Sequence, residues 1–186
     1  MKNRFLFLPL SLALVLSVFA EHHEHSGAGH AENSNSLFQA TFLGGYDYAI
    51  GHLMQLAEAI PADTYDWAPA EGVRTVEKTL LHVAAANYML AAKLGATLPS
   101  GVEPMSIESK DHDKESAIET LKASIDLAKK TIAELEEEDL ATKVEFFGMQ
   151  QNKMFIVLTI GAHANEHLGQ LIAYARSNDI TPPWSK

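Results

Sequence analysis

Apolar residues recur at spacings of three and four in four separate stretches of this chain, which is the period of one face of an α-helix. The clearest stretch runs from about Lys114 to Glu138. Its apolar seam is unbroken and consists of Ile118, Leu121, Ile125, Ala128, Ile132 and Leu135. The same periodicity predicts helices from about Ser36 to Pro61, Thr75 to Gly95 and Lys153 to Ser177. No strand alternation of useful length is present, so the pattern predicts an all-α four-helix bundle.

The segments between the predicted helices have the composition of loops. Residues 61–72 contain two prolines and end in a glycine, and residues 96–113 are rich in small, polar and proline residues. Residues 136–152 form a third loop, in which Val144–Phe147 can form a short extended piece. The whole chain has no cysteine, so packing alone must stabilise it, without disulfides or a thiolate nucleophile. The folded part, residues 36–186, is long enough for one domain with its own core.

Residues 1–20 are predicted to be a cleavable signal peptide. Lys2 and Arg4 precede an apolar run that ends at the small residue Ala20, and the run is shorter than a membrane span requires. No cysteine follows the run, which excludes a bacterial lipoprotein anchor. The mature chain is therefore expected to be exported, to the periplasm, with no stable membrane association after cleavage. An uncleaved N-terminal anchor is the alternative.

Residues 21–35 are predicted to form a flexible arm, because they are polar and lack large apolar side chains. The arm carries a cluster of four histidines, His22, His23, His25 and His30. Such a cluster can bind metal loosely, or it can be a solvated tail with no specific role.

The net charge limits the partners that this chain can have. The formal charge is -10, and removing Lys2 and Arg4 with the signal peptide makes it -12. An acidic balance of this size argues against nucleic acids and anionic membrane surfaces as partners. A small-molecule substrate fits better, and a homodimer formed through the bundle's helices is also compatible with the sequence.

Three histidines at central positions of the predicted helices are candidate metal ligands. His163 and His167 stand four residues apart on the apolar face of the last helix, so their imidazoles can converge on one ion. His82 lies in the middle of the second helix beside small alanines, although the periodicity does not settle where it points. Three nitrogen ligands would leave positions open for water or substrate, as in catalytic sites. The alternative is that all three are core histidines with hydrogen-bonded partners. His52 and His112 are assigned no role.

The segment "HANEH", residues 163–167, also matches the HxxEH pattern of some zinc peptidases. That class needs a further carboxylate ligand downstream and a large substrate-binding domain. Only Asp179 follows as a carboxylate, and Glu166 is turned about 100° away from His167 on the helix. The peptidase interpretation therefore fails on context.

Two segments of the chain resemble the DinB/YfiT-like superfamily of bacterial four-helix bundles. These are "VRTVEKTLLHVAAANYML" around His82 and "HANEHLGQLIAYARSNDITPPWS" from His163 onward, and Trp67 and the Arg74–Thr75 pair are also similar. The resemblance covers about residues 36–185. It implies a bundle in which His82, His163 and His167 hold one divalent ion.

The resemblance implies several activities but no single reaction. Members with known activity include thiol-dependent transferases and isomerases, and others are described as hydrolases. The predicted export signal departs from the thiol-using members, which are cytoplasmic. We therefore expect a metal-dependent hydrolase or transferase of unknown substrate. Gln170, Tyr174 and Glu166 are weak candidates for catalytic roles, and Asn165 lies close in sequence.

The metal and the role of the site stay open at this stage. Three imidazoles suit zinc or nickel first, and iron or copper as well. One alternative function is a non-catalytic periplasmic metal-binding or metal-delivery protein, which the His-rich arm favours. Another is a bundle that pairs with a second copy, in which the metal site is vestigial.

Overall fold

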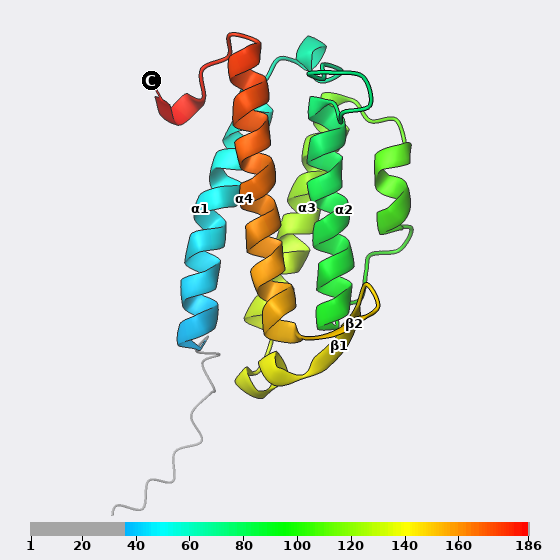
Figure 1. Ribbon diagram of the computed structural model, residues 1–186, viewed down its shortest axis with the longest axis vertical. Helices are drawn as coiled ribbons and strands as arrows, with labels where there is room; N and C mark the ends of the chain where they lie inside the picture. The colour runs from blue at the N-terminus through cyan, green and yellow to red at the C-terminus, as the bar shows by residue number, and fades with distance from the viewer. Residues whose placement is uncertain (1–35, 186) are drawn as a thin grey trace, which may run out of the picture. The chain divides into compact units, whose positions relative to one another are not determined.

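A computed structural model describes residues 36–185. The predicted signal peptide (1–20) and His-rich arm (21–35) lie outside the described residues. The main elements are four long helices, α1 (Leu37–Ala59), α2 (Val76–Leu94), α3 (Lys114–Ala133) and α4 (Lys153–Ser177). They pack side by side as a four-helix bundle, as the apolar periodicity predicts (Figure 1).

The helices do not simply alternate in direction along the chain. Figure 1 shows α1 and α4 running toward one end of the bundle and α2 and α3 toward the other. Because α2 and α3 are parallel, residues 95–113 must return along the length of the bundle. This crossover contains the short 3-10 helix η2 (Pro104–Ser109), which packs against α2. The crossover thus brings loop residues alongside the middle of α2, where His82 lies.

The helix starts follow local capping signals in the sequence. Ser36 forms a capping box with Gln39 at the start of α1, and the Thr75 and Asn152 side chains cap α2 and α4. The loop before α2 also docks on its first turn, since the amides of Val76 and Glu77 donate to backbone carbonyls of that loop. These caps place the first residues of α2 and α4 at the positions that the sequence predicts.

The predicted end of the third helix is wrong. The periodicity extends it to about Glu138, whereas α3 ends at Ala133 and a 3-10 helix, η3 (Glu137–Ala141), follows. The last turn would place the acidic run 136–138 at the negative end of the helix dipole, which is unfavourable. In its place, the Gln39 side-chain amide donates to the carbonyls of Ile132 and Leu135 at 2.7 and 2.6 Å. Leu135 remains buried although it lies outside the helix.

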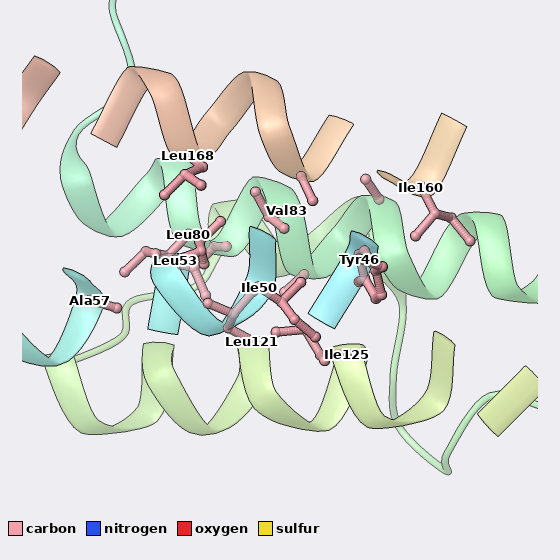
Figure 2. Close-up of a cluster of buried hydrophobic side chains, with 14 of the residues drawn as sticks. Tyr46, Ile50, Leu53, Ala57, Leu80, Val83, Leu121, Ile125, Ile160 and Leu168 are labelled. Carbon is pink, nitrogen blue, oxygen red and sulfur yellow. The ribbon is translucent and has the colours of Figure 1, made fainter. Parts of the chain in front are cut away.

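The centre of the bundle is apolar and is built from all four helices. Figure 2 shows its middle layers, with side chains such as Leu53, Leu80, Leu121 and Leu168 pointing inward. One polar network crosses this core. The Tyr46 hydroxyl donates to the Asn87 Oδ1 atom at 3.2 Å, the Asn87 amide donates to the Ser124 Oγ atom at 3.2 Å, and Ser124 donates to the Leu121 carbonyl at 2.6 Å. Each buried polar group in this network is therefore satisfied.

A small antiparallel hairpin joins α3 to α4. Its strands are β1 (Lys143–Phe146) and β2 (Met149–Asn152). The sequence indicates an extended piece only at Val144–Phe147, so the second strand was not predicted. The two-residue turn has positive φ at both Phe147 (48°) and Gly148 (79°), as tight hairpin turns require. Among residues 36–185, no helix is both long and apolar enough to span a bilayer.

Candidate metal centre

The three predicted histidines come together between α2 and α4. The Nε2 atom of His163 lies 3.2 Å from the Nε2 atom of His82 and 3.1 Å from that of His167. His82 therefore points toward α4, which the periodicity left open. Within the part of the chain that the structure describes, these residues form the one cluster whose spacing suits a metal ion.

The cluster lies at the edge of the core. His167 is buried, with 7% of its surface exposed, whereas His82 and His163 are half-buried. A pocket of about 410 Å³ lies beside the cluster, and His82 and His163 form part of its wall. The cluster is thus reachable from one side through this pocket.

A chain of hydrogen bonds fixes the tautomer of His167. The chain begins at the Arg74 carbonyl, which can only accept, and the Tyr174 hydroxyl donates to it at 3.2 Å. Tyr174 then accepts from the Gln170 Nε2 atom at 2.6 Å, which turns the Gln170 Oε1 atom toward the His167 Nδ1 atom at 2.8 Å. Because that oxygen can only accept, His167 carries its proton on Nδ1. The lone pair of its Nε2 atom points into the cluster.

Glu108 fixes the tautomer of His82 in the same way. Its Oε1 atom accepts from the His82 Nδ1 atom at 2.7 Å, and its Oε2 atom accepts from the Arg74 Nε atom at 2.7 Å. Burial alone would raise the pKa of Glu108, but the hydrogen bonds from Arg74 and His82 lower it below its ordinary value. Glu108 lies in η2 and was missed by sequence reasoning. The signal that could have found it is a carboxylate in a loop long enough to fold back over His82.

Burial and mutual repulsion keep the histidines of α4 neutral. Desolvation, followed by the charges of His167 and His82, lowers the pKa of His163 from 6.5 to about 4. Desolvation also lowers the pKa of His167. Both rings are therefore neutral near pH 7, which is the form that ligates metal ions.

This donor set fits a divalent cation. The Nε2 atoms of His82 and His167 carry no hydrogen, and both direct a lone pair at the Nε2 atom of His163. That atom carries at most one hydrogen, so it can donate to only one of the two. At least one lone pair in the cluster thus faces another nitrogen without a hydrogen bond. Replacing that proton by a cation would satisfy all three nitrogens, and carboxylate or amide partners on the far ring nitrogens are typical of metal-ligating histidines.

The other candidate residues divide into two groups. Gln170 and Tyr174 contact the cluster through His167, so they hold it in position. Glu166 is exposed and makes no hydrogen bond to the clustered histidines. Asn165 is exposed as well and donates only to the Gly161 carbonyl of its own helix. Trp67, part of the family-like pattern, packs edge-on against the Tyr174 ring.

The two remaining described histidines take no part in the cluster. The Nδ1 atom of His52 lies 2.8 Å from the Tyr48 carbonyl, and its ring packs between those of Tyr48 and Trp184. His112 lies half-buried in the loop before α3.

The helical fold and the histidine cluster agree with the family to which the sequence belongs. The family model of the DinB superfamily matches residues 46–171, more than half of the chain, so this chain belongs to that superfamily. The match includes all three clustered histidines. No curated protein matches the sequence at a significant level.

Solved structures share the fold at low sequence identity. A DinB-like protein from Bacillus cereus superposes with a TM-score of 0.67 and 17% identity, covering 77% of this chain and 95% of that one. A DinB-like protein from Bacillus subtilis, YjoA, gives 0.61 and 20%, covering 76% and 93%. A conserved protein from Enterococcus faecalis gives 0.59 and 16%, covering 74% and 95%. At these identities the likeness supports the fold alone.

Proposed function

We propose that this chain is an exported DinB-superfamily protein that holds one divalent metal ion through His82, His163 and His167. We further propose that the protein uses this ion to catalyse hydrolysis or group transfer on a small molecule. The observation that carries it is the convergence of the three Nε2 atoms: those of His82 and His167, whose tautomers are fixed, lie 3.2 and 3.1 Å from that of His163. A core histidine cluster without a cation has no comparable reason to orient its lone pairs inward.

Besides the three proposed ligands, the site contains residues that hold the ligands in position. An ion bound in this way with open positions would act as a Lewis acid or lower the pKa of a bound water or thiol. Glu108 and Gln170 hold the rings of His82 and His167 and keep a proton on each Nδ1 atom. Arg74 links these two supports, since its guanidinium holds Glu108 and its carbonyl accepts from Tyr174. The ligands are thereby preorganised before an ion arrives.

A metal titration of the purified chain tests this proposal. His82→Ala, His163→Ala and His167→Ala should each remove most of the affinity, because two imidazoles hold an ion weakly. Glu166→Ala is the matched control on the same helix and should bind as the wild type does. Loss of binding in Glu166→Ala but not in His82→Ala would restore the HxxEH interpretation.

The pocket beside the cluster favours an enzyme over a metal-delivery protein, because a delivery site needs no room for a second ligand. The histidines of residues 21–35 favour delivery. Deleting residues 21–35 separates the two functions. An enzyme centre predicts one tight site that is indifferent to the deletion, whereas several weak sites lost with the arm would indicate delivery.

Export is proposed on the sequence of residues 1–20 alone. The intact mass of the mature protein tests it. A chain that begins at Glu21 would support export, and a membrane-bound species that retains residues 1–20 would contradict it.

A further inference from the structure

The pocket beside the histidine cluster has a polar end and an apolar end. The polar end is formed by His82, His163, Arg74 and Glu108. The rest of the wall is mostly apolar, with Ala85, Met89, Met105, Phe146 and Phe147 as its main side chains. Its volume of about 410 Å³ lies in the range of small-ligand sites, roughly 300–1,000 Å³. This shape suits one small molecule with a polar head and an apolar tail.

Two segments outside the bundle helices contribute to the apolar end, beside the side chains of α2. Met105 belongs to η2, and Phe146 and Phe147 belong to the hairpin. The hairpin is held over α2 by an ion pair between Lys93 and Glu145, at 2.8 Å, and against α4 by the edge-to-face contact of Phe146 with Phe155. The wall is therefore assembled from three distant parts of the sequence.

Two large apolar side chains stay exposed at the pocket. Met105 is 88% exposed and Phe147 is 72% exposed, although both line the pocket wall. Phe147 also occupies a turn position with positive φ, where asparagine, aspartate or glycine is favoured. An aromatic ring at this place weakens the turn, and although it packs edge-on against the Phe146 ring, most of its surface stays exposed. A ligand tail that covers both side chains would account for them.

The charges at the polar end indicate the sign of the head group. Apart from the histidines, Arg74 and Glu108 are the only charged residues among the described residues that line the pocket, and they offset each other. A histidine ligates an ion as the neutral ring, so a bound divalent ion would leave the polar end with a net charge of about +2. An anionic head group is complementary to that charge.

We propose that this pocket binds a small amphiphilic anion, with a carboxylate or similar head at the metal end and an aliphatic or aryl-alkyl tail against Met89, Met105 and Phe147. This inference rests on the proposed metal site and names its substrate class. Medium-chain monocarboxylates are the simplest members of the class, and octanoate serves as the probe.

Calorimetric titration of the zinc-loaded full chain with octanoate and with butyrate tests the tail. Octanoate has four more methylenes, each worth about fourfold when buried, so it should bind roughly 250-fold more tightly if all four are buried. Octanol, which lacks the anionic head, should bind at least about tenfold more weakly than octanoate. With cobalt in place of zinc, octanoate should shift the visible absorption bands of the ion, because its head lies at the metal.

Two variants locate the tail. Phe147→Asn supplies a residue type that the turn prefers, so folding should be kept while octanoate affinity falls roughly threefold to tenfold and butyrate affinity does not change. Met105→Asn on η2 should act in the same direction. Met149→Asn is the matched control, because Met149 is exposed on the same hairpin but does not line the pocket.

The outcomes separate this inference from the metal site on which it rests. Tight zinc binding with equal affinities for octanoate and butyrate, or with octanoate affinity unchanged in both pocket variants, overturns the amphiphile and leaves the metal site standing. Absence of zinc binding overturns both. A cobalt spectrum unmoved by octanoate overturns the placement of the head at the ion.

Discussion

Two polar clusters lie within the same bundle, and their difference separates structure from function. The Tyr46–Asn87–Ser124 network is buried, and each of its polar side-chain atoms has a hydrogen-bond partner. The histidine cluster is half-buried, opens to a pocket and directs lone pairs at one another. The first network links α1, α2 and α3 with nothing left to bind. In the histidine cluster, at least one nitrogen lone pair has no hydrogen bond. Unsatisfied polar groups of this kind are typical of a ligand-binding site.

The largest effect on stability is expected in the closed network. Asn87→Ala leaves the buried Tyr46 hydroxyl without its partner and opens a small cavity, so the free energy of unfolding should fall by about 2–3 kcal/mol. Metal affinity should not change. Chemical denaturation and metal titration of the same variant measure both, with Asn165→Ala on the surface of α4 as the control. A parallel loss of metal affinity would break the distinction between the two clusters.

Chelation should affect the open cluster without unfolding the bundle. Four apolar helix faces bury enough surface to fold alone, so circular dichroism should stay helical after metal removal. The stabilisation lost is the linkage term, about 2.7 kcal/mol when free metal exceeds the dissociation constant a hundredfold. A fall in the thermal midpoint with an unchanged helical signal is the expected result. Wholesale unfolding on chelation would show that the cluster is part of the structural framework.

Gln170 contacts the cluster through the Nδ1 atom of His167 and is not one of the proposed ligands. Gln170→Ala frees the His167 tautomer, so metal affinity should fall roughly 10–100-fold, the range typical of residues that orient metal ligands. The helical signal should be unchanged. Asn165→Ala again serves as the control, since Asn165 bonds only within α4. Equal affinities in the two variants would mean that the hydrogen bond from His167 to Gln170 does not orient the ligand.

The smallest effect is a pH dependence confined to the open cluster. In the folded chain the pKa of His163 is about 4, compared with about 6.5 when unfolded. Between these values the unfolded chain binds more protons, so the metal-free fold is at full stability above about pH 6.5 and loses stability as pH falls toward 4. After allowance for solvent screening of a half-exposed ring, the loss is about 1 kcal/mol. Denaturation at several pH values should show this slope in the wild type and a smaller slope in His163→Gln. Identical slopes in the two proteins would show that His163 is not the source of the pH dependence.

The helices and the histidine pair of α4 could be predicted from the sequence because their signals are local. Spacings of three and four mark the buried faces, and caps such as Ser36, Thr75 and Asn152 mark the starts. The pair His163 and His167 needs only helical geometry to converge. His82 is a candidate from its position in the middle of the second helix, and the family resemblance strengthens that prediction, since its direction is ambiguous within its own helix.

Glu108, which holds His82, and the pocket could not be predicted because they depend on long-range packing. Glu108 reaches His82 only because the crossover returns along α2, and no local pattern encodes that path. Likewise, the end of α3 at Ala133 is held by Gln39 of α1, which donates to the carbonyls of Ile132 and of Leu135 just beyond the helix. The hairpin wall was missed because its second strand, Met149–Asn152, is too short and polar to show a strand pattern.

Elemental analysis of untagged protein, purified from the cells that make it, is the most direct test of whether His82, His163 and His167 hold one divalent ion. Wild type and His82→Ala are measured side by side. We expect one equivalent of a transition metal or zinc per wild-type chain and almost none in the variant. One tightly bound equivalent in both proteins, or none in either, would contradict this expectation.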